Sequence, residues 1–530
     1  MKSFLSRFRE LILFTLTGFD RLRLCGESRL LNHVGGVNSY LYQQRVPFKG
    51  YSEHAEKLTR RFLDESRQQA GDVPYRYLPS SSTDKEAVAL ELAHRHGRTQ
   101  GRIALIACQE SARTYRARGV GKDENGKRLL GLVEEQTRCL HHYHYFLHER
   151  FGLCYVRIGS WFPFSVRVGL NGRRWLGQEL RNRGVGCTLR DNLITHVDDA
   201  ALAQQLLDEQ AGIDWPAQMR DLVRPVHPLW DYLHDDAVST PYYWMAEQTE
   251  WATDFLFRNR DDLTRLYPRF LDHCIRTLDC KDVLRFLGRK VPEKGYGTCS
   301  GEAKIDYRTR NEGTRIKFWY DTNSLKMYDK GAVSPTLGGI ALRLECTINQ
   351  PKGYKVFRLK EGAGEDAQPS WQDLRKGVAD LPRRAEVSQA AVNRLADSLA
   401  KAEEKVPLGK LLEPLGRPVF DAQGRRRARP LNPLTGQDGD VLRWIAKGDF
   451  LINGFRNRDL RHAQYGESSD PVERRRQAGK VTRLLALLRA HDLIQKVQKT
   501  HRYQLTAQGR RVTAALSAVH EMSIEQLAAA

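Results

Sequence analysis

Apolar and polar residues alternate with different periods along the chain, and each change of period marks an expected element. Residues 1–98 have helical spacing and loops, with an amphipathic helix over the apolar run 11–16 and another helix at 85–95. Residues 99–235 alternate with a period of two, which predicts an antiparallel sheet with helices on one face. The expected strands are residues 102–109, 129–134, 139–147, 153–158 and 164–170. Asn171-Gly172 favours a tight turn after the last strand, and a helix begins near Arg174.

The second half of the chain contains three segments that differ in apolar spacing and composition. Residues 236–295 carry apolar side chains at the spacing of buried helices. Residues 296–405 form a β-hairpin and helix region, with strands at 314–320, 324–329 and 340–349 and a helix at 387–405. The Pro-, Gly- and Arg-rich segment 406–435 has the composition of a linker.

Residues 436–530 follow the order helix, helix, helix, hairpin, helix, which is the order of a winged-helix domain. Asn457 caps the second helix, and Thr506 caps the last one. Two short strands at 493–497 and 503–505 make the hairpin. The fold class is therefore α+β and multidomain, with an antiparallel sheet core with helices, a helical middle, a β-hairpin region and a C-terminal winged helix.

The third helix of this domain separates apolar from basic residues. It begins at Asp470-Pro471, an acidic cap followed by proline at the first helical position. Apolar residues at helical spacing predict a core-facing stripe, and basic residues lie on a face roughly 130° away. The stripe is Val481, Leu484, Leu485 and Leu488; the basic residues are Arg475, Arg476, Lys480 and Arg483, with Lys496, Lys499 and Arg502 on the hairpin. A helix of this kind suits the major groove of DNA.

The charge of the chain supports a polyanionic partner. The net charge is +21, from 85 basic and 64 acidic residues. Residues 405–530 hold 23 basic and 12 acidic residues, so 23 − 12 = +11 of the excess lies there. This field favours DNA or RNA. The alternative is a basic solvated helix on a protein–protein module.

Other classes of protein find little support. The chain has no apolar stretch of about 20 residues, so a membrane span and a membrane partner are not expected. The short apolar run near the N-terminus has no cleavage site behind it, and the nine cysteines form no Cys-x-x-Cys pair, which favours a reduced, cytoplasmic protein. No phosphate-binding glycine loop or serine-hydrolase motif appears.

Several short segments of the chain match known sequences. They are residues 18–21, 151–152, 161–164, 171–173, 286–289, 326–330, 342–349, 453–459 and 481–485. Through these segments the chain resembles, from end to end, a large family of uncharacterised bacterial proteins with a C-terminal winged-helix domain. The resemblance implies multicopy genes of the mobile-element kind and supplies no activity. One departure is the segment 331–341, which is longer than the usual turn of the family and puts the local hairpin register in question.

A second, local resemblance concerns about twenty-five residues. A strand ending in Tyr328-Asp329-Lys330 is followed by one reading Leu342-Arg343-Leu344-Glu345. This order is similar to rolling-circle replication initiators, which nick DNA with a tyrosine.

A run of histidines fits the same chemistry. His142-Tyr143-His144 matches the His-hydrophobic-His pattern of metal-dependent nicking enzymes, in which two imidazoles on one strand face hold a divalent cation. Tyr242 and Tyr243, expected to precede a helix, are the candidate nucleophiles. Mg²⁺ or Mn²⁺ would be the cofactor of a nuclease, and otherwise none is expected. The alternative is that these rings pack inside a sheet or stack on RNA bases.

The hairpins near residue 320 carry cations interleaved with aromatic rings. Arg315, Lys317 and Trp319 alternate onto one face, Lys326 lies on the partner strand, and Arg343 shares a face with Glu345. Such a face suits a nucleic-acid platform. Two alternatives remain open: an ion-pair network around Glu345, or a metal site of Glu345 with Glu302 or Asp306.

A smaller candidate site, for a phosphate group, lies at the start of the helix near residue 174. Arg173 and Arg174, together with the backbone N–H groups there, suit a phosphate. A solvated basic helix end explains the same residues.

The sequence therefore predicts a nucleic-acid-binding protein of a mobile element or defence system, with a winged helix on duplex DNA. A metal-dependent nuclease or tyrosine nickase, and an RNA-binding or RNA-guided effector, remain alternatives. The target sequence and the oligomeric state are not determined by the residues.

Overall fold

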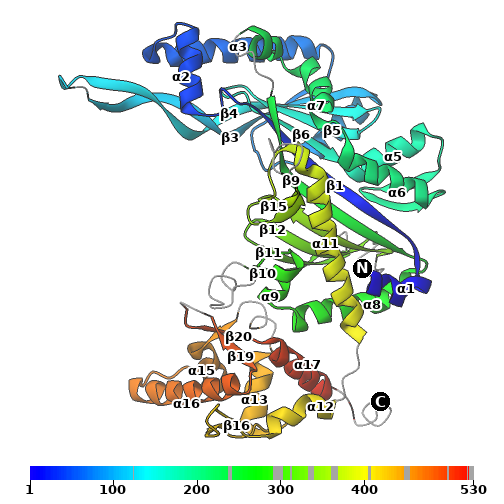
Figure 1. Ribbon diagram of the computed structural model, residues 1–530, viewed down its shortest axis with the longest axis vertical. Coiled ribbons are helices and arrows are strands. Elements are labelled where there is room, and N and C mark those ends of the chain that lie inside the picture. Colours follow the sequence, from blue (N-terminus) through cyan, green and yellow to red (C-terminus); the bar gives the residue numbers. More distant parts are fainter. Residues whose placement is uncertain are drawn as a thin grey trace. The chain divides into compact units, whose positions relative to one another are not determined.

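The computed structural model contains two compact units (Figure 1). Unit 1 comprises Met1–Phe14, Phe255–Cys346 and Gln389–Ala530, and unit 2 comprises Thr15–Asp254 and Thr347–Ser388. The structure describes residues 1–530 except 123, 237–241, 291–302, 311–312, 332–338, 360–367, 404–407, 447–449, 451–453, 498–499, 522 and 524–530. Helices and strands both contribute, so the α+β class is confirmed.

Unit 2 is built on a sheet with the strand order β9-β1-β6-β5-β4-β3-β2. Pairing is antiparallel from β1 through β6, β5 and β4 to β3, and the edge strand β2 pairs with β3 in parallel. The strands are β1 (Ile12–Ser28), β2 (Tyr75–Leu78), β3 (Gly101–Lys122), β4 (Arg128–His148), β5 (Gly152–Gly159), β6 (Val166–Asn171) and β9 (Tyr242–Phe257).

Helices and two short hairpins complete unit 2. The helices are α2 (Val34–Gln43), α3 (Tyr51–Ala70), α4 (Lys85–Arg95), α5 (Gly172–Asn182), α6 (Ala200–Glu209) and α7 (Trp215–Val223). The hairpins are β7 (Cys187–Arg190) with β8 (Leu193–Val197), and β14 (Lys355–Arg358) with β15 (Ser370–Asp373). The strands expected between residues 102 and 170 are confirmed, and those at 102–109 and 129–147 are parts of one long β3–β4 hairpin (Figure 1).

Two expected helices are strands instead. Residues 12–16 of the apolar run belong to β1, and only Lys2–Phe8 (α1) is helical at the N-terminus. From Arg21 to Ser28 every second residue of β1 is buried, which is the period of a strand. Residues 249–257 of β9 are buried without a break. A strand covered on both faces has no alternation, so its apolar pattern is indistinguishable from that of a buried helix.

Unit 1 contains a second set of strands, in the order β10-β11-β12-β13. Their bounds are β10 (Ala303–Arg310), β11 (Gly313–Tyr320), β12 (Asn323–Lys330) and β13 (Ala341–Ile348), which confirms the strands expected here. The helices α8 (Arg260–Thr277) and α9 (Cys280–Phe286) accompany them, and α11 (Leu381–Leu399) begins in unit 2 and ends in unit 1.

The C-terminal part of unit 1 encloses a hydrophobic core of its own, made of residues between Leu415 and Leu516. A three-stranded antiparallel sheet, β18-β20-β19, packs with the helices around it. The elements are α12 (Leu408–Leu412), β16 (Val419–Phe420), β17 (Arg426–Ala428), α13 (Gly436–Ile445), β18 (Phe455–Arg456), α15 (Asn457–Tyr465), α16 (Pro471–Ala490), β19 (Ile494–Lys496), β20 (Arg502–Leu505) and α17 (Ala507–Glu521).

The segment expected as a linker is folded in part. It holds α12 and the β16–β17 hairpin, and Leu415 and Leu431 lie in the C-terminal core. Two buried leucines anchor this stretch, although its composition is that of a loop.

Two further findings concern the helices and the cysteines of the described residues. None of the described helices combines the length and apolar character that crossing a bilayer requires. No disulfide joins the eight cysteines that the structure describes.

Candidate nucleic-acid interface

Helix α16 begins and packs as its sequence predicts. The Asp470 carboxylate accepts hydrogen bonds from the backbone N–H groups of Val472 (2.9 Å) and Glu473 (3.3 Å), and Pro471 occupies the first helical position. The four residues of the predicted stripe, Val481, Leu484, Leu485 and Leu488, are all buried. The opposite side of α16 is therefore left to its basic residues.

A groove of about 680 Å³ runs along this basic side of α16, and we call it the α16 groove. Five cationic side chains line it, from β17, the residue after β17, and α16. They are Arg427, Arg429, Lys480, Arg483 and Arg489; the other lining residues are Ala428, Gln437, Tyr465, Leu484, Ala486, Leu487 and Ala490. None of these lining residues carries a carboxylate, so the wall of the groove is positively charged.

Most cations of the α16 groove are not neutralised by the protein. Within the described part of the chain, Arg427, Arg483 and Arg489 make no side-chain hydrogen bond or ion pair. Lys480 lies over the Tyr465 ring, 5.8 Å from its centroid. Arg429 differs, because its two terminal nitrogens lie 2.7 and 2.8 Å from the buried carboxylate of Asp438. This pair fixes the wall of the groove on the β17 side.

The other predicted residues of this region have different surroundings. Arg475 is exposed, but Arg476 makes a two-point ion pair with Glu473, at 2.8 and 3.0 Å. On the hairpin, Lys496 is exposed, while Arg502 is half-buried and donates a hydrogen bond to the Gly454 carbonyl (3.3 Å). Lys499 lies outside the described residues.

Asn457 has a role that the sequence did not predict. It was expected to cap α15, but its side-chain amide donates to the Ala478 carbonyl and to the Thr482 hydroxyl, both at 3.0 Å. Asn457 therefore ties α15 to α16. The expected cap at Thr506 is confirmed, since its hydroxyl accepts from the Gly509 N–H group at 3.0 Å.

The β11–β13 sheet differs from its predicted role as a nucleic-acid platform. Lys326 and Arg315 are buried, and Arg343 is fully buried. The Lys326 ammonium makes a short ion pair with the buried Glu345 carboxylate. These three buried cations cannot contact phosphates, so the platform prediction is wrong for them, and the alternative of an ion-pair network around Glu345 fits them.

Two predicted members of that platform are less covered. Lys317 and Trp319 are half-buried, and the Lys317 ammonium lies 5.1 Å from the centre of the Trp319 ring. We predicted that Arg315, Lys317 and Trp319 share one face of a strand. The β11–β12 register, in which Lys317 is paired with Lys326, agrees with this prediction. The interleaving of cations and rings was therefore predicted correctly, and only its exposure was not.

The predicted phosphate site at the start of α5 is a structural ion pair. Arg173 is fully buried, donates to the Asp254 carboxylate at 3.0 Å, and reaches the Ala252 carbonyl at 2.9 Å. Arg174 pairs with Glu86 at 2.7 Å. Asn171 forms no tight turn; it caps α5 by accepting from the N–H groups of Arg173 and Arg174. The phosphate prediction for these two arginines is therefore corrected.

The histidine run splits between the two faces of the unit 2 sheet. His142 and His144 share a face, as predicted, and both are buried. The Ser66 hydroxyl of α3 lies 2.7 Å from His142 Nδ1. Burial lowers the pKa of His142 to about 4 and that of His144 well below its usual value. Among the described residues no carboxylate or thiol completes a three-ligand group with these imidazoles. They pack as neutral rings.

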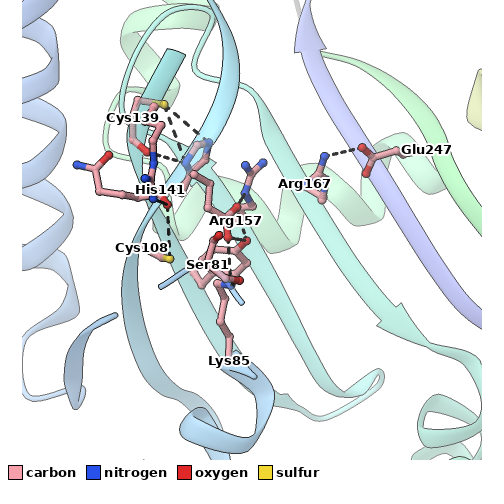
Figure 2. Close-up of polar contacts among 12 residues, drawn as sticks. Ser81, Lys85, Cys108, Cys139, His141, Arg157, Arg167 and Glu247 are labelled. Atoms are coloured by element: carbon pink, nitrogen blue, oxygen red, sulfur yellow. Dashed lines mark hydrogen bonds and ion pairs between the residues drawn. The ribbon is translucent and has the colours of Figure 1, made fainter. Parts of the chain in front are cut away.

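His141 lies on the opposite face, in the polar cluster of Figure 2. The hub of this cluster is Glu110. It accepts a hydrogen bond from the Tyr143 hydroxyl, which lies 2.8 Å from both carboxylate oxygens, and it pairs with Lys85 and Arg157, each at 3.1 Å. Burial alone would raise the pKa of Glu110, but the Tyr143 hydrogen bond and the two cations outweigh it and hold that pKa below its usual value. The carboxylate is saturated and has no capacity for a ligand.

The candidate tyrosines do not precede a helix, since they open strand β9. The Tyr242 hydroxyl is buried between the His227 ring and the Phe164 carbonyl, at 3.0 Å from each. Burial raises the pKa of Tyr242 far above its usual value. Tyr243 is half-buried, and the guanidinium of Arg29 lies 4.7 Å from its ring centre. A buried, neutral phenol is a poor nucleophile, so Tyr242 does not suit a nicking role.

Acidic oxygens for a metal occur elsewhere in unit 2. The carboxylates of Asp20 and Glu250 are buried and lie within 4.8 Å of each other, and Asp20 accepts from the Asn192 amide at 2.7 and 2.8 Å. Such oxygens are the ligands that Mg²⁺ and Mn²⁺ prefer, but a carboxylate pair does not by itself define a site. Of the partners considered for Glu345, Glu302 and the side chain of Asp306 lie outside the described part of the chain.

Three cations and one aromatic ring of the α16 groove were missed by sequence reasoning: Arg427, Arg429, Arg489 and Tyr465. A signal for the first two was present, because residues 425–429 include four arginines. It was assigned to a linker, whereas β17 lies against α16. No protein-family model, no curated protein and no solved structure matches the chain.

Proposed function

We propose that the protein binds nucleic acid, and that α16 is the recognition helix of a winged-helix domain that contacts duplex DNA through the α16 groove. One observation carries this proposal: cationic side chains line the groove, and Arg427, Arg483 and Arg489 have no carboxylate partner in the described part of the chain. The order of the surrounding elements, three helices followed by a hairpin and a helix, is the order of that domain.

Unneutralised cations on one wall favour a polyanion for a simple reason. Like charges held close together repel, and a phosphate backbone relieves this repulsion while it releases the counterions condensed on DNA. A small anion would neutralise one or two of these side chains. A duplex presents a row of phosphates, so it can neutralise several of the cations that line the groove along Lys480–Ala490 of α16.

The resemblance to bacterial families of the mobile-element kind supplies the proposed context, a mobile genetic element or a defence system. RNA is the second ligand to test, since phosphates of either polymer satisfy the groove. The nuclease and nickase alternatives lose their strongest residues, because His142, His144 and Tyr242 are buried.

The proposal is tested with the double variant Arg427→Glu plus Arg483→Glu. Each cation that contacts a phosphate contributes about 0.9 to the slope of log K against log salt. We therefore expect this variant to bind duplex DNA at least tenfold more weakly at moderate salt, with a slope that is shallower by about 2. Fluorescence anisotropy on duplex DNA, single-stranded DNA and RNA measures both quantities and ranks the three ligands.

The matched control carries the same change of charge elsewhere. Arg60→Glu plus Arg220→Glu reverses two exposed arginines of α3 and α7, remote in sequence from the groove. Equal weakening in both double variants would show that only net charge matters, and the proposed interface would then be withdrawn.

A further inference from the structure

Unit 2 buries two arginines with too few partners. Arg384, in the first turn of α11, has no exposed surface, and none of its three guanidinium nitrogens has a hydrogen-bond partner. Arg358, at the end of β14, is also buried, and its Nε and Nη2 atoms have no hydrogen-bond partner. The Ser388 hydroxyl, one turn along α11 from Arg384, is a further buried donor without an acceptor.

Only one carboxylate among the described residues is recorded close to this pair. Asp380 is buried and lies 3.8 Å from Arg358, beyond hydrogen-bond distance, and one of its oxygens already accepts from the Arg375 N–H group at 2.8 Å. Asp380 is also the nearest charge that supports the ionised form of Arg384. Within the described part of the chain, two guanidiniums therefore have one carboxylate between them, and one positive charge has no counter-charge there.

This arrangement is costly for the apo protein. A buried guanidinium that lacks acceptors loses its hydration without replacement, and buried polar groups in folded proteins nearly always have partners. Burial lowers the pKa of Arg384 to about 10, although the charge of Asp380 opposes this shift. The N-terminal turn of α11 adds positive potential, which disfavours a cation there and favours an anion.

We propose that Arg358, Arg384 and Ser388 form a binding site for a tetrahedral oxyanion, of which phosphate is the chemical class expected. Two guanidiniums supply charge-assisted hydrogen bonds in the planar geometry that phosphate oxygens match, and the Ser388 hydroxyl supplies one more donor. One bound anion neutralises the excess charge. This site is separate from the α16 groove and does not depend on the proposed nucleic-acid function.

A cavity of unit 2 shares one residue with the surroundings of the site. Asp380 lines this cavity of about 510 Å³, together with Arg29, Tyr243, Trp244 and Arg375. Arg358 therefore lies 3.8 Å from a residue of the cavity wall. Aromatic rings stack on nucleobases, so a nucleotide is the alternative source of the phosphate group. Inorganic phosphate and a mononucleotide are distinguished in the experiment.

The experiment measures the melting temperature of the full-length protein as inorganic phosphate replaces chloride at constant ionic strength. A ligand that binds only the folded state raises the melting temperature as its concentration exceeds its dissociation constant. We expect a saturable rise on the order of 2 °C or more for the wild type. Adenosine monophosphate serves as the second probe; a larger rise at a lower concentration assigns the base to the cavity.

The variant Arg384→Met keeps most of the side-chain volume and removes the charge. We expect it to lose the phosphate response and, without phosphate, to melt no lower than the wild type, because a buried unpaired charge has been removed. Arg358→Met should lose the response as well, so one misfolded variant does not leave the proposal untested. Arg383→Met is the matched control on the same turn of α11 and keeps the response.

Two results overturn the proposal: an equal phosphate response in the wild type and in Arg384→Met, or no response in the wild type. The groove variant Arg427→Glu plus Arg483→Glu distinguishes the oxyanion site from the proposed nucleic-acid interface. It should lose duplex binding and retain the phosphate response.

Discussion

The α16 groove and the β11–β13 sheet contain the same kinds of residue and have opposite environments. Both place a lysine next to an aromatic ring: Lys480 with Tyr465 in the groove, and Lys317 with Trp319 on the sheet. In the groove, Arg427, Arg483 and Arg489 have no carboxylate partner among the described residues. On the sheet, Lys326 is buried against Glu345, and Arg343 has no exposed surface.

The difference shows what a cationic pattern by itself can and cannot indicate. A desolvated cation needs a partner of opposite charge inside the protein, and the pair then contributes to the structure of the core. A solvated cation without such a partner keeps its field for ligands in solution. Function therefore follows from burial and pairing, and the periodicity of the basic residues is common to both cases.

The largest effect is expected from a variant that breaks the buried ion pair of the β11–β13 sheet. Glu345→Ala removes the carboxylate that forms the short ion pair with the buried Lys326 ammonium. Removing one partner of a buried pair costs about 3–5 kcal/mol, so the free energy of unfolding should fall by that amount. Urea denaturation measures the loss, and duplex binding per folded molecule should not change.

The double variant Lys326→Met plus Glu345→Leu is the matched control, because it removes both charges and should recover much of the stability. If Glu345→Ala unfolds at the same urea concentration as the wild type, Lys326 is solvated. The β11–β13 sheet then becomes a candidate nucleic-acid surface again.

Acidification gives the next effect and separates stability from binding. The folded-state pKa of His142 is lowered by burial to about 4, below the unfolded value near 6.5. Between these values the unfolded state binds more protons, so stability is full above pH 6.5 and is lost as the pH falls towards 4. At pH 5 the loss is on the order of 2 kcal/mol for this one residue.

Thermal denaturation between pH 8 and pH 5 measures that slope. His142→Gln, which keeps a hydrogen-bonding group near Ser66, should make the slope shallower by the contribution of His142, and the buried His144 keeps its own contribution. Duplex binding by the guanidinium and ammonium groups of the groove should stay constant over this range, since they remain charged. A flat stability curve for the wild type would mean that His142 is solvated.

The smallest effect compares two arginines of one helix. Arg483 has no carboxylate partner in the described chain, whereas Arg476 is held by Glu473 at 2.8 and 3.0 Å. Arg483→Ala should weaken duplex binding by roughly fivefold to tenfold at 0.1 M salt, the value of about one phosphate contact. Arg476→Ala should weaken it less than half as much, because its charge is already neutralised. Anisotropy titrations in parallel give both numbers, and the reverse order would contradict the pairing argument.

The sequence predicted most local elements because their signals are local. The cap Asp470, the proline after it and the stripe from Val481 to Leu488 determine α16 without reference to the rest of the chain. Strands β3 to β5 are bounded by turn residues such as Gly152, which mark their ends although residues 103–108 of β3 and most of β5 are buried on both faces. Strand β9 was missed because its stretch 249–257 is buried without a break and shows no alternation.

The site was predicted less completely, for a physical reason. Lys480 and Arg483 were found on the basic face of α16, but Arg427 reaches the same groove only because the β16–β17 hairpin folds back against that helix. Arg173 and Arg343 were assigned to nucleic acid, although tertiary packing buries both. Whether an arginine is exposed or paired is decided by residues far away in the chain, here Asp254 for Arg173.

The salt dependence of duplex binding tests the central claim most directly. The variant in which Arg427, Lys480, Arg483 and Arg489 are all changed to glutamine removes the cations of the α16 groove except the Asp438-paired Arg429. If these four side chains contact phosphates, the slope of log K against log salt should become shallower by about 3 to 4. An unchanged slope, with the variant folded, would show that the groove does not touch the nucleic acid.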